Sequence, residues 1–354
     1  MGATAWAPAP ELLTEPERAL ARGAWVKLIG GASNQDLAAI EDLAGIHTLA
    51  GVHCLDVAAD PAVVAAARRG MGWAAARGAR RPWLMVSLSD GLDPHFRKAW
   101  FDPARCPPAC PRPCERVCPA LAIDGRGVAA ARCYGCGRCL PACPHGLIEE
   151  RSQVVAPAAL AGLLAELAPD AVELHTRPGR LEAFAERVEQ LRASGVPLRR
   201  VAVSAGLEDG GGSVEGLAAE LWQRFRLLRR AGFRPLWQLD GRPMSGDVGI
   251  GTARAAVALL ERLAPLAPPG PLQLAGGTNA RTLALLERSP AAVPRAAGVA
   301  FGGVARRQLQ PLLQEAEAEG RRLLDLPRLW PRALALTQAL VGPWLARGAG
   351  GGGP

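Results

Sequence analysis

The stretch Cys133-Tyr-Gly-Cys136-Gly-Arg-Cys139-Leu-Pro-Ala-Cys143-Pro144 sets four cysteines at the spacing C-x2-C-x2-C-x3-C-P. Bacterial two-cluster ferredoxins use this spacing, and the fourth cysteine of each run binds the cluster of the other run. A looser run precedes it, with three residues in each gap and a proline after the last cysteine: Cys106, Cys110, Cys114, Cys118, Pro119. The two runs predict a ferredoxin-like module with two 4Fe-4S clusters.

Crossover of the fourth cysteine assigns the ligands of each predicted cluster. The first cluster takes Cys106, Cys110, Cys114 and Cys143. The second takes Cys133, Cys136, Cys139 and Cys118. An internal repeat indicates a duplicated module, because the segments 118–123 and 143–148 both begin with Cys-Pro and end with Ile. The wider gaps of the first run leave the geometry and potential of its cluster open.

Disulfides, zinc and radical chemistry are the competing explanations for these cysteines. The first residues show no charged segment followed by an apolar one, so we expect a reducing, cytoplasmic location in which disulfides are rare. All-cysteine zinc sites usually separate two short knuckles by a longer loop, unlike these crowded runs. A radical enzyme would use three cysteines for its cluster, whereas four are available for each cluster here. The iron–sulfur interpretation is therefore favoured.

The charge of the chain is +8, but its pattern does not favour nucleic acid as a partner. Lys27 and Lys98 are the only lysines, and the arginines are dispersed among acidic residues rather than gathered in blocks. A basic face is suited instead to docking an acidic redox partner. No apolar run approaches the roughly 20 residues of a membrane span, so we expect none.

Outside the cysteine runs, short strand-like segments alternate with helical patterns, which is typical of a parallel sheet built from βαβ units. The eight strand-like segments are Trp25–Gly30, Val52–Val57, Trp83–Leu88, Ala171–His175, Arg199–Ser204, Pro235–Asp240, Leu272–Ala275 and Gly298–Phe301. Successive starts are 26–37 residues apart, except for one interval of 88 residues that contains all the clustered cysteines. Removing the 60 residues 91–150 shortens that interval to 28. The remaining core is close to the roughly 250 residues typical of a (β/α)8 barrel.

We therefore predict an α/β protein with a (β/α)8 barrel-like core and a ferredoxin-like module inserted after the third strand. An open doubly wound parallel sheet is the alternative, although the first turn, 30–34, lacks the dinucleotide-binding fingerprint. The predicted division is an N-terminal arm (1–24), barrel (25–90), insert (91–150), barrel (151–320), C-terminal helical segment (321–347) and disordered tail (348–354). Asp60 and Ser213 are predicted helix N-caps.

Polar residues gather in or just after the predicted strands, most of them near the carboxyl ends that form a barrel mouth. They are Lys27, Asp56, Glu173, His175, Gln238, Asp240 and Asn279. Two interpretations remain open, a ligand pocket and a hydrogen-bonded polar layer that closes the barrel. Double glycines follow the last two strands: Gly276, Gly277, Gly302 and Gly303. They are either tight turns or a site for a phosphate or a flavin tail, because many barrels bind phosphate there.

Three stretches carry a resemblance to a known family: Lys27–Asp36, Ala50–Arg68 and Pro113–Pro119. They resemble the cyanobacterial light-dependent period (LdpA) family. The resemblance implies iron–sulfur clusters held by the eight cysteines. It also implies a role in adjusting the circadian period to light by reporting cellular redox state, with clock input components as protein partners.

Two functions are compatible with these features. The first is a redox sensor or electron carrier that exchanges electrons with ferredoxin or a quinone pool and is not itself an enzyme. The second is a ferredoxin-coupled oxidoreductase with a flavin or a phosphate-bearing substrate at the barrel mouth. A third possibility is an enzyme scaffold retained only for binding, and the sequence does not distinguish it from the redox sensor.

Overall fold

The computed structural model describes residues 14–152, 154–207, 212–242 and 250–347. Its centre is a closed barrel of eight parallel strands in the order β1-β12-β11-β10-β9-β8-β3-β2. The strands are β1 (Trp25–Gly31), β2 (Cys54–Ala58), β3 (Trp83–Ser89), β8 (Ala171–His175), β9 (Arg200–Ala205), β10 (Pro235–Asp240), β11 (Leu272–Ala275) and β12 (Ala296–Phe301). The predicted barrel is confirmed, and each predicted strand run matches one barrel strand with ends that differ by at most two residues. Because β1 pairs with β12, the open sheet is excluded.

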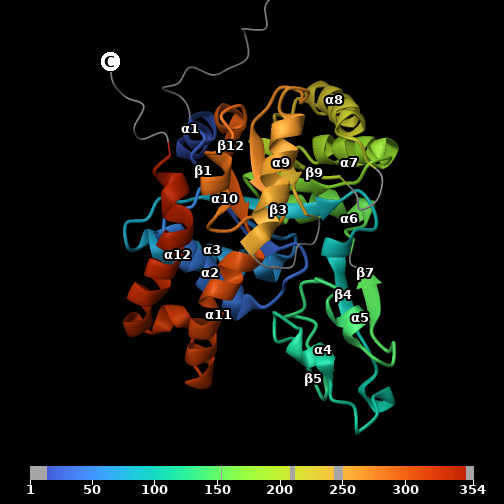
Figure 1. Cartoon of the computed structure of the whole chain (residues 1–354), viewed down its shortest axis with the longest axis vertical. Coiled ribbons are helices and arrows are strands. Elements are labelled where there is room, and N and C mark those ends of the chain that lie inside the picture. The colour runs from blue at the N-terminus through green and yellow to red at the C-terminus, as the bar shows by residue number, and fades with distance from the viewer. Residues whose placement is uncertain (1–13, 153, 208–211, 243–249, 348–354) are drawn as a thin grey trace, which may run out of the picture.

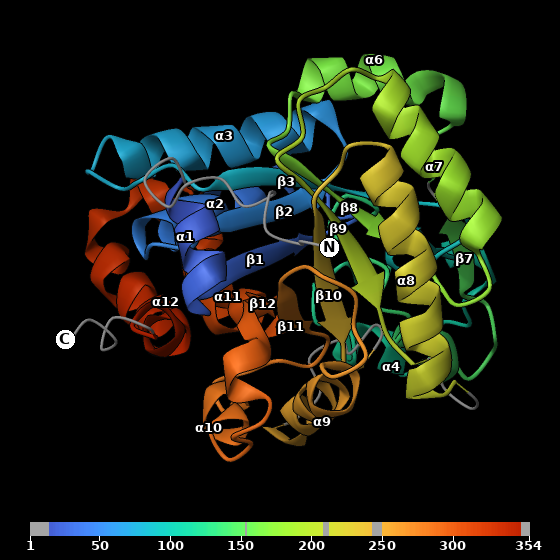
Figure 2. The same cartoon turned by 90° about the horizontal axis from the view of Figure 1, so that it is seen from above.

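The barrel strands are nearly continuous apolar runs, since parallel strands are covered on both faces. All seven residues of β3 are buried, as are all six of β12. Helices surround the strands, as Figure 2 shows from above. They are α1 (Glu15–Arg22), α2 (Leu37–Leu49), α3 (Pro61–Ala75), α6 (Pro157–Leu167), α7 (Leu181–Ala193), α8 (Val214–Arg230), α9 (Ala253–Leu263), α10 (Thr282–Leu286), α11 (Gly303–Ala318) and α12 (Trp330–Leu345).

Helix starts follow the capping residues that the sequence indicates. The Asp60 carboxylate accepts hydrogen bonds from the N–H groups of Ala62 and Val63 at the start of α3. The Ser213 hydroxyl accepts one from Gly216 N–H at the start of α8. Both predicted N-caps are confirmed, and each satisfies backbone donors that the helix itself leaves free.

Helix α1 covers the amino end of the barrel. Its Ala19 and Leu20 pack into an apolar layer with Trp25 and Trp83. Glu17 of α1 accepts hydrogen bonds from the guanidinium of Arg200 at 2.6 and 2.9 Å. These contacts close the end of the barrel opposite to the mouth.

The cysteine-bearing segment leaves the barrel after β3 and returns before α6 (Figure 1). It contains two antiparallel strand pairs and two helices of one turn each. The elements are β4 (Arg97–Trp100) paired with β7 (Glu149–Ser152), β5 (Ile123–Asp124) paired with β6 (Gly127–Val128), α4 (Pro113–Arg116) and α5 (Cys139–Ala142). The predicted tail, 348–354, lies outside the described residues. Within the described residues, no helix is both long and apolar enough to cross a bilayer.

Candidate functional site

The cysteine segment has a small apolar core of its own. Phe101, Ile123 and Ile148 are buried together with the thiols of Cys114 and Cys139. The two isoleucines are the equivalent last residues of the internal repeat, and they pack into the same core. The two copies of the sequence repeat therefore contribute equivalent side chains to one core.

The cysteines gather in the pattern expected for crossed ligands. Burial, and after it the neighbouring thiols of Cys136, Cys133 and Cys118, raise the pKa of Cys139 to about 12. Burial also raises the pKa of Cys114, and here the neighbouring thiol is Cys143. Cys118 of the first run thus lies by the first three cysteines of the second run, and Cys143 of the second run lies by Cys114 of the first. Cys106 and Cys110 are half-buried, and Cys106 packs against the module core.

Backbone N–H groups point at the sulfurs that the repeat makes equivalent. Ala122 N–H donates to Cys118 Sγ at 3.2 Å, and Leu147 N–H donates to Cys143 Sγ at 3.4 Å. In both cases the donor lies four residues after the cysteine. Leu121 and Gly146, also equivalent, share a left-handed backbone with φ of 50° and 58°. The chain thus forms the same loop twice, although leucine rarely adopts that conformation.

This arrangement fits a thiolate-bound cluster. None of the nine cysteines, all of which lie in the described part of the chain, forms a disulfide. Thiols this close to one another cannot easily all lose their protons, because the resulting thiolates repel each other. The pKa of Cys136 is raised accordingly, first by burial and further by the neighbouring Cys118. Cluster iron supplies the positive charge that such thiolates lack, and N–H groups aimed at sulfur are known to tune cluster potential.

Inside the barrel, four of the predicted polar residues form one buried network. Lys27 Nζ lies 2.7 Å from Asp56 Oδ2 and also contacts the Glu173 carboxylate. Gln238 Nε2 donates to Glu173 Oε1 at 2.6 Å. Burial lowers the pKa of Lys27, but the charges of Asp56 and Glu173 outweigh it and hold that pKa above its usual value. This part of the set is a hydrogen-bonded layer that fills the barrel.

The remaining predicted residues lie at the mouth. His175 Nε2 is 3.1 Å from Glu173 Oε1, and Asp240 Oδ1 is 3.4 Å from Gln238 Nε2. Burial raises the pKa of Asp240 to about 7, with Glu173 as a further cause. Asn279 is separate from this network and lies beside Gly277, whose carbonyl also accepts from Thr252 Oγ1 at 2.6 Å.

A cavity of about 120 Å³ opens at the mouth between the cysteine module and the last strands. Cys136 lines one side of it. The four predicted glycines, together with His175, Gln238, Asp240 and Asn279, line the rest. The polar residues, the double glycines and one cluster cysteine, which are far apart in sequence, therefore share one cavity.

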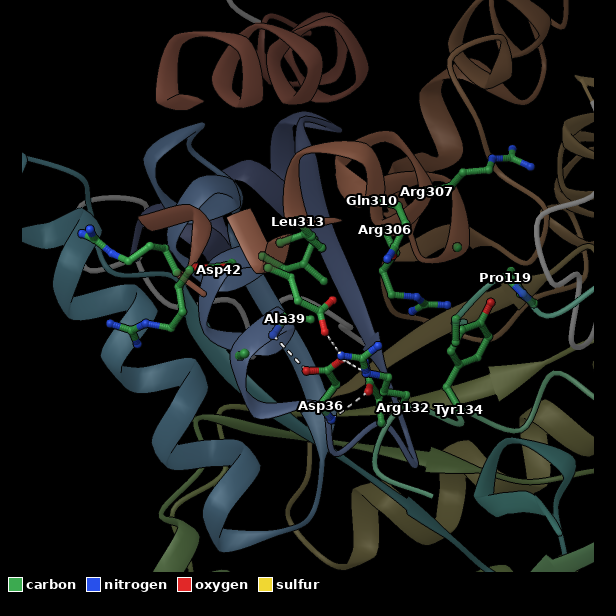
Figure 3. Close-up of a pocket in the computed structure, with 18 residues that line it drawn as sticks. Asp36, Ala39, Asp42, Pro119, Arg132, Tyr134, Arg306, Arg307, Gln310 and Leu313 are labelled. Carbon is green, nitrogen blue, oxygen red and sulfur yellow. Dashed lines mark hydrogen bonds and ion pairs between the residues drawn. The ribbon is translucent and has the colours of Figure 1, made fainter. Parts of the chain in front are cut away.

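A second cavity, of about 150 Å³, lies along the seam between the module and the barrel helices (Figure 3). We define the seam by Arg132 and Tyr134 of the module and by Asp36, Arg306 and Glu317 of the barrel. Arg132 Nε is 3.6 Å from Asp36 Oδ2, and Arg132 also contacts Glu317. Arg306 Nη1 donates to the carbonyls of Ile29 and Gly30 at 3.0 and 3.2 Å.

Comparison with known proteins identifies the family. The family model described as the LdpA Fe-S cluster-binding domain matches residues 106–154, which include all eight clustered cysteines. The model of the light dependent period A C-terminal domain matches residues 163–343. A protein of Synechococcus elongatus named "Light dependent period A" is 46% identical over 341 residues, 95% of each chain. The chain belongs to the LdpA family. Its cysteine segment is of the iron–sulfur-binding class.

Solved structures that resemble this LdpA-family chain are barrel enzymes at low similarity. The carboxyl transferase domain of Rhizobium etli pyruvate carboxylase is 12% identical, with a TM-score of 0.43 over 93% of this chain and 49% of that one. Tryptophan synthase from M. tuberculosis is 12% identical, with a TM-score of 0.43 over 95% of this chain and 99% of that one. At these scores the matches carry no argument about function.

Several residues of the site were not predicted from the sequence. Ser87 and Gln273 extend the buried network, to Asp56 at 2.8 Å and to Gln238 at 2.9 Å. Their polarity within apolar strands is a signal that could have found them. Asp93, His95, Tyr134 and Arg306 lie in loops or at a helix start, where no periodic pattern marks a side chain as part of a site.

Proposed function

We propose that the chain is a redox sensor that carries two 4Fe-4S clusters. One cluster is held by Cys106, Cys110, Cys114 and Cys143. The other is held by Cys133, Cys136, Cys139 and Cys118. The observation that carries this proposal is the crossed grouping of the thiols, in which Cys118 lies by Cys133, Cys136 and Cys139 and Cys143 lies by Cys114. Crossed ligation is the mark of two-cluster ferredoxin modules.

The seam offers a route from cluster charge to the outer surface. Tyr134 lies between two ligands of the second cluster, and its ring faces Arg306 at the start of α11. Reduction adds a negative charge to the cluster, which attracts nearby guanidinium groups more strongly. A partner that contacts α11 or Arg132 would then bind the two redox states with different free energies, which is the condition for a signal.

The proposed partners follow from the family and from charge. Clock input components are the protein partners that kinship with the light-dependent period proteins suggests. Ferredoxin or a quinone pool is the proposed donor or acceptor of electrons. The net charge of +8 suits an acidic redox partner. We place this exchange in the cytoplasm, where thiols remain reduced.

Anaerobic purification followed by iron and sulfide analysis tests the proposal. About eight irons and eight sulfides per chain, with two paramagnetic signals after reduction, are expected. Four irons would refute the first cluster, and zinc in place of iron would refute both. Binding of an acidic ferredoxin should then be stronger for one redox state than for the other, and equal affinity would refute sensing through that partner.

The barrel-mouth cavity favours a second candidate function, a ferredoxin-coupled oxidoreductase. Cys136 and the double glycines line the same cavity, so a ligand held there would lie beside the second cluster. At about 120 Å³ the cavity is smaller than the 300–1,000 Å³ typical of pockets for larger ligands, which favours a small phosphate-bearing substrate over a complete flavin. A flavin absorbance in the purified protein, or turnover of a phosphorylated substrate with reduced ferredoxin, would favour the enzyme over the sensor.

A further inference from the structure

We propose that Asp93, His95 and His175 form a mononuclear site for a divalent metal such as zinc at the barrel mouth. The inference deepens the second candidate function, because it supplies the cavity with a Lewis acid, and it does not depend on cluster occupancy. The potential ligand atoms of the three side chains all lie within 4.8 Å of one another.

The fold brings these residues together from two segments 80 or more residues apart in sequence. His175 is the last residue of β8, and it pairs in register with Ser89, the last residue of β3. Asp93 and His95 lie four and six residues after the end of β3, at the start of the inserted segment. Two adjacent strand ends thus place two imidazoles and one carboxylate at one corner of the mouth.

The spacing of the three groups suits metal binding after small shifts of the side chains, which separate Asp93 from His95 slightly and bring His175 closer. Asp93 Oδ1 is 2.7 Å from His95 Nδ1, and the imidazole centroids of His95 and His175 are 4.8 Å apart. Ligand atoms on tetrahedral zinc, with bonds of about 2.0–2.1 Å, lie about 3.4 Å from each other. The three side chains can therefore reach one ion by rotamer adjustment.

The surroundings hold the proposed ligands in place. The Asp93 carboxylate also accepts the backbone N–H of His95 at 2.8 Å, which fixes the turn that carries both residues. The ring of Phe96 packs edge-on against His175, with centroids 5.2 Å apart. Asp93 and His175 are only 8% and 7% exposed. Burial of this kind limits competition from water for the metal.

Glu173 supplies the outer support that a ligating histidine requires. His175 Nε2 is 3.1 Å from Glu173 Oε1, so Nδ1 is the ring nitrogen available to a cation. Carboxylate–histidine pairs orient metal-ligating imidazoles in this way. Glu173 is itself held by Lys27 and Gln238, so the support extends into the rigid barrel layer.

Three protein ligands leave one coordination position open, which is typical of catalytic rather than structural zinc sites. His95 and His175 line the mouth cavity that also contains Cys136 and the double-glycine turns. The open position would therefore face a ligand bound in that cavity. The metal would polarise a carbonyl or phosphoryl oxygen of that ligand.

An ion-pair network without metal is the competing explanation of the same geometry. Arg177 Nε lies 3.9 Å from Asp93 Oδ2, and a charged His175 between Glu173 and Asp93 would balance both carboxylates. The two explanations differ in one measurable property, because only a metal site binds zinc in stoichiometric amount.

Anaerobic equilibrium dialysis of the iron-loaded protein against Zn²⁺, with zinc and iron measured in the same sample, tests the site. We expect one zinc per chain with unchanged iron, and a loss of affinity of about 100-fold or more in His95→Ala and Asp93→Asn. His145→Ala is the matched control, because His145 is an exposed imidazole of the same segment outside the cavity, and it should keep the zinc. Absence of zinc at full iron content, or equal binding by His95→Ala, would overturn the proposal.

Zinc-edge X-ray absorption provides a readout that does not rely on variants. Nitrogen and oxygen ligands alone, at about 2.0–2.1 Å, are expected. Sulfur at about 2.3 Å would show that zinc occupies the cysteines, and it would overturn the proposed site. Low iron with nitrogen and oxygen ligation of zinc would instead count against the two-cluster function while supporting this site.

Discussion

Arg306, in the first turn of α11, lies over the ring of Tyr134, with its guanidinium carbon 4.2 Å from the ring centroid. The two residues are 172 positions apart in sequence, and Figure 3 shows their side chains facing each other across the seam. Tyr134 follows Cys133 directly, so this contact is a short physical link between a cluster ligand and a barrel helix. The contact is a cation–π interaction between the cysteine module and the barrel, and it places a positive charge near a cluster ligand.

Replacing Arg306 should therefore change the midpoint potential of the second cluster as well as the stability of the fold. Arg306→Gln removes a cation near the cluster, so the reduced state loses stabilisation and the midpoint potential should fall by on the order of 20–40 mV. That range corresponds to about 0.5–1 kcal/mol at 59 mV per tenfold change. Redox titration followed by paramagnetic resonance measures it. Tyr134→Phe should leave the contact intact, Arg281→Gln on the exposed surface should have no effect, and an unchanged potential in Arg306→Gln would exclude this link.

Crossed ligation predicts which variants share a phenotype. Cys118→Ala and Cys136→Ala should each lose about four irons and leave the same paramagnetic spectrum, because both remove ligands of one cluster. Cys114→Ala and Cys143→Ala should leave the other spectrum. Cys54→Ala is the control, since Cys54 is buried in β2 and should keep all eight irons. A Cys118→Ala spectrum that matches Cys114→Ala would contradict the crossing.

The two lysines of the chain should differ sharply in their contribution to stability. Lys27→Met leaves Asp56 and Glu173 buried without their cation, which is expected to cost about 3–5 kcal/mol. Lys98 donates to Gln35 Oε1 at 2.7 Å and to a backbone carbonyl, both neutral, so Lys98→Met should cost about 1–3 kcal/mol. Anaerobic thermal unfolding by circular dichroism compares them. Equal shifts of the two midpoints would argue against a charged network in the barrel.

The barrel, which the structure confirms, and the proposed cysteine ligands could both be predicted because each prediction depends on a local pattern. Apolar runs such as 83–88 indicate a buried strand by themselves. The cysteine spacing of 133–143 indicates cluster ligands within one short segment. The arm predicted for residues 1–24, a segment with prolines at 8, 10 and 16, contains helix α1, which no sequence pattern indicated. Proline is compatible with the first turn, where its missing N–H costs nothing, and α1 begins there.

Contacts between distant segments were beyond the reach of sequence patterns. Nothing local to His95 indicates that it lies beside His175, because that proximity arises only when β3 pairs with β8. The division of the polar set has the same origin. Lys27 and Asp56 point into the filled barrel, whereas Asn279 lies after a strand end and lines the mouth cavity. Which residue takes which place depends on the register of the strands around the closed barrel.

Two buried histidines should make the fold sensitive to mild acid. Burial lowers the pKa of His47 and of His53 to about 4, below the value of about 6.5 expected in the unfolded chain. Between these values the unfolded state binds more protons, so stability should fall as pH decreases from 7 to 5. His47→Leu should reduce that loss, measured as the change in thermal midpoint between the two pH values. His145→Gln, at an exposed site, should not, and an unaltered slope in His47→Leu would contradict a neutral buried imidazole.

We propose residues 91–150 as a domain that the barrel does not need in order to fold. Among the residues that the structure describes, none from 91–150 belongs to the main apolar core, and the insert has its own core around Phe101 and Ile148. Deletion removes the polar contacts of the seam, which lie at the surface and usually contribute about 1 kcal/mol or less each. It also removes two buried contacts to the barrel, Lys98 to Gln35 and Phe96 against His175. A chain with 91–150 replaced by a short glycine-rich linker should therefore keep its helical circular dichroism and a cooperative thermal transition, and it should bind no iron. An unfolded product would show that the insert is part of the folding unit.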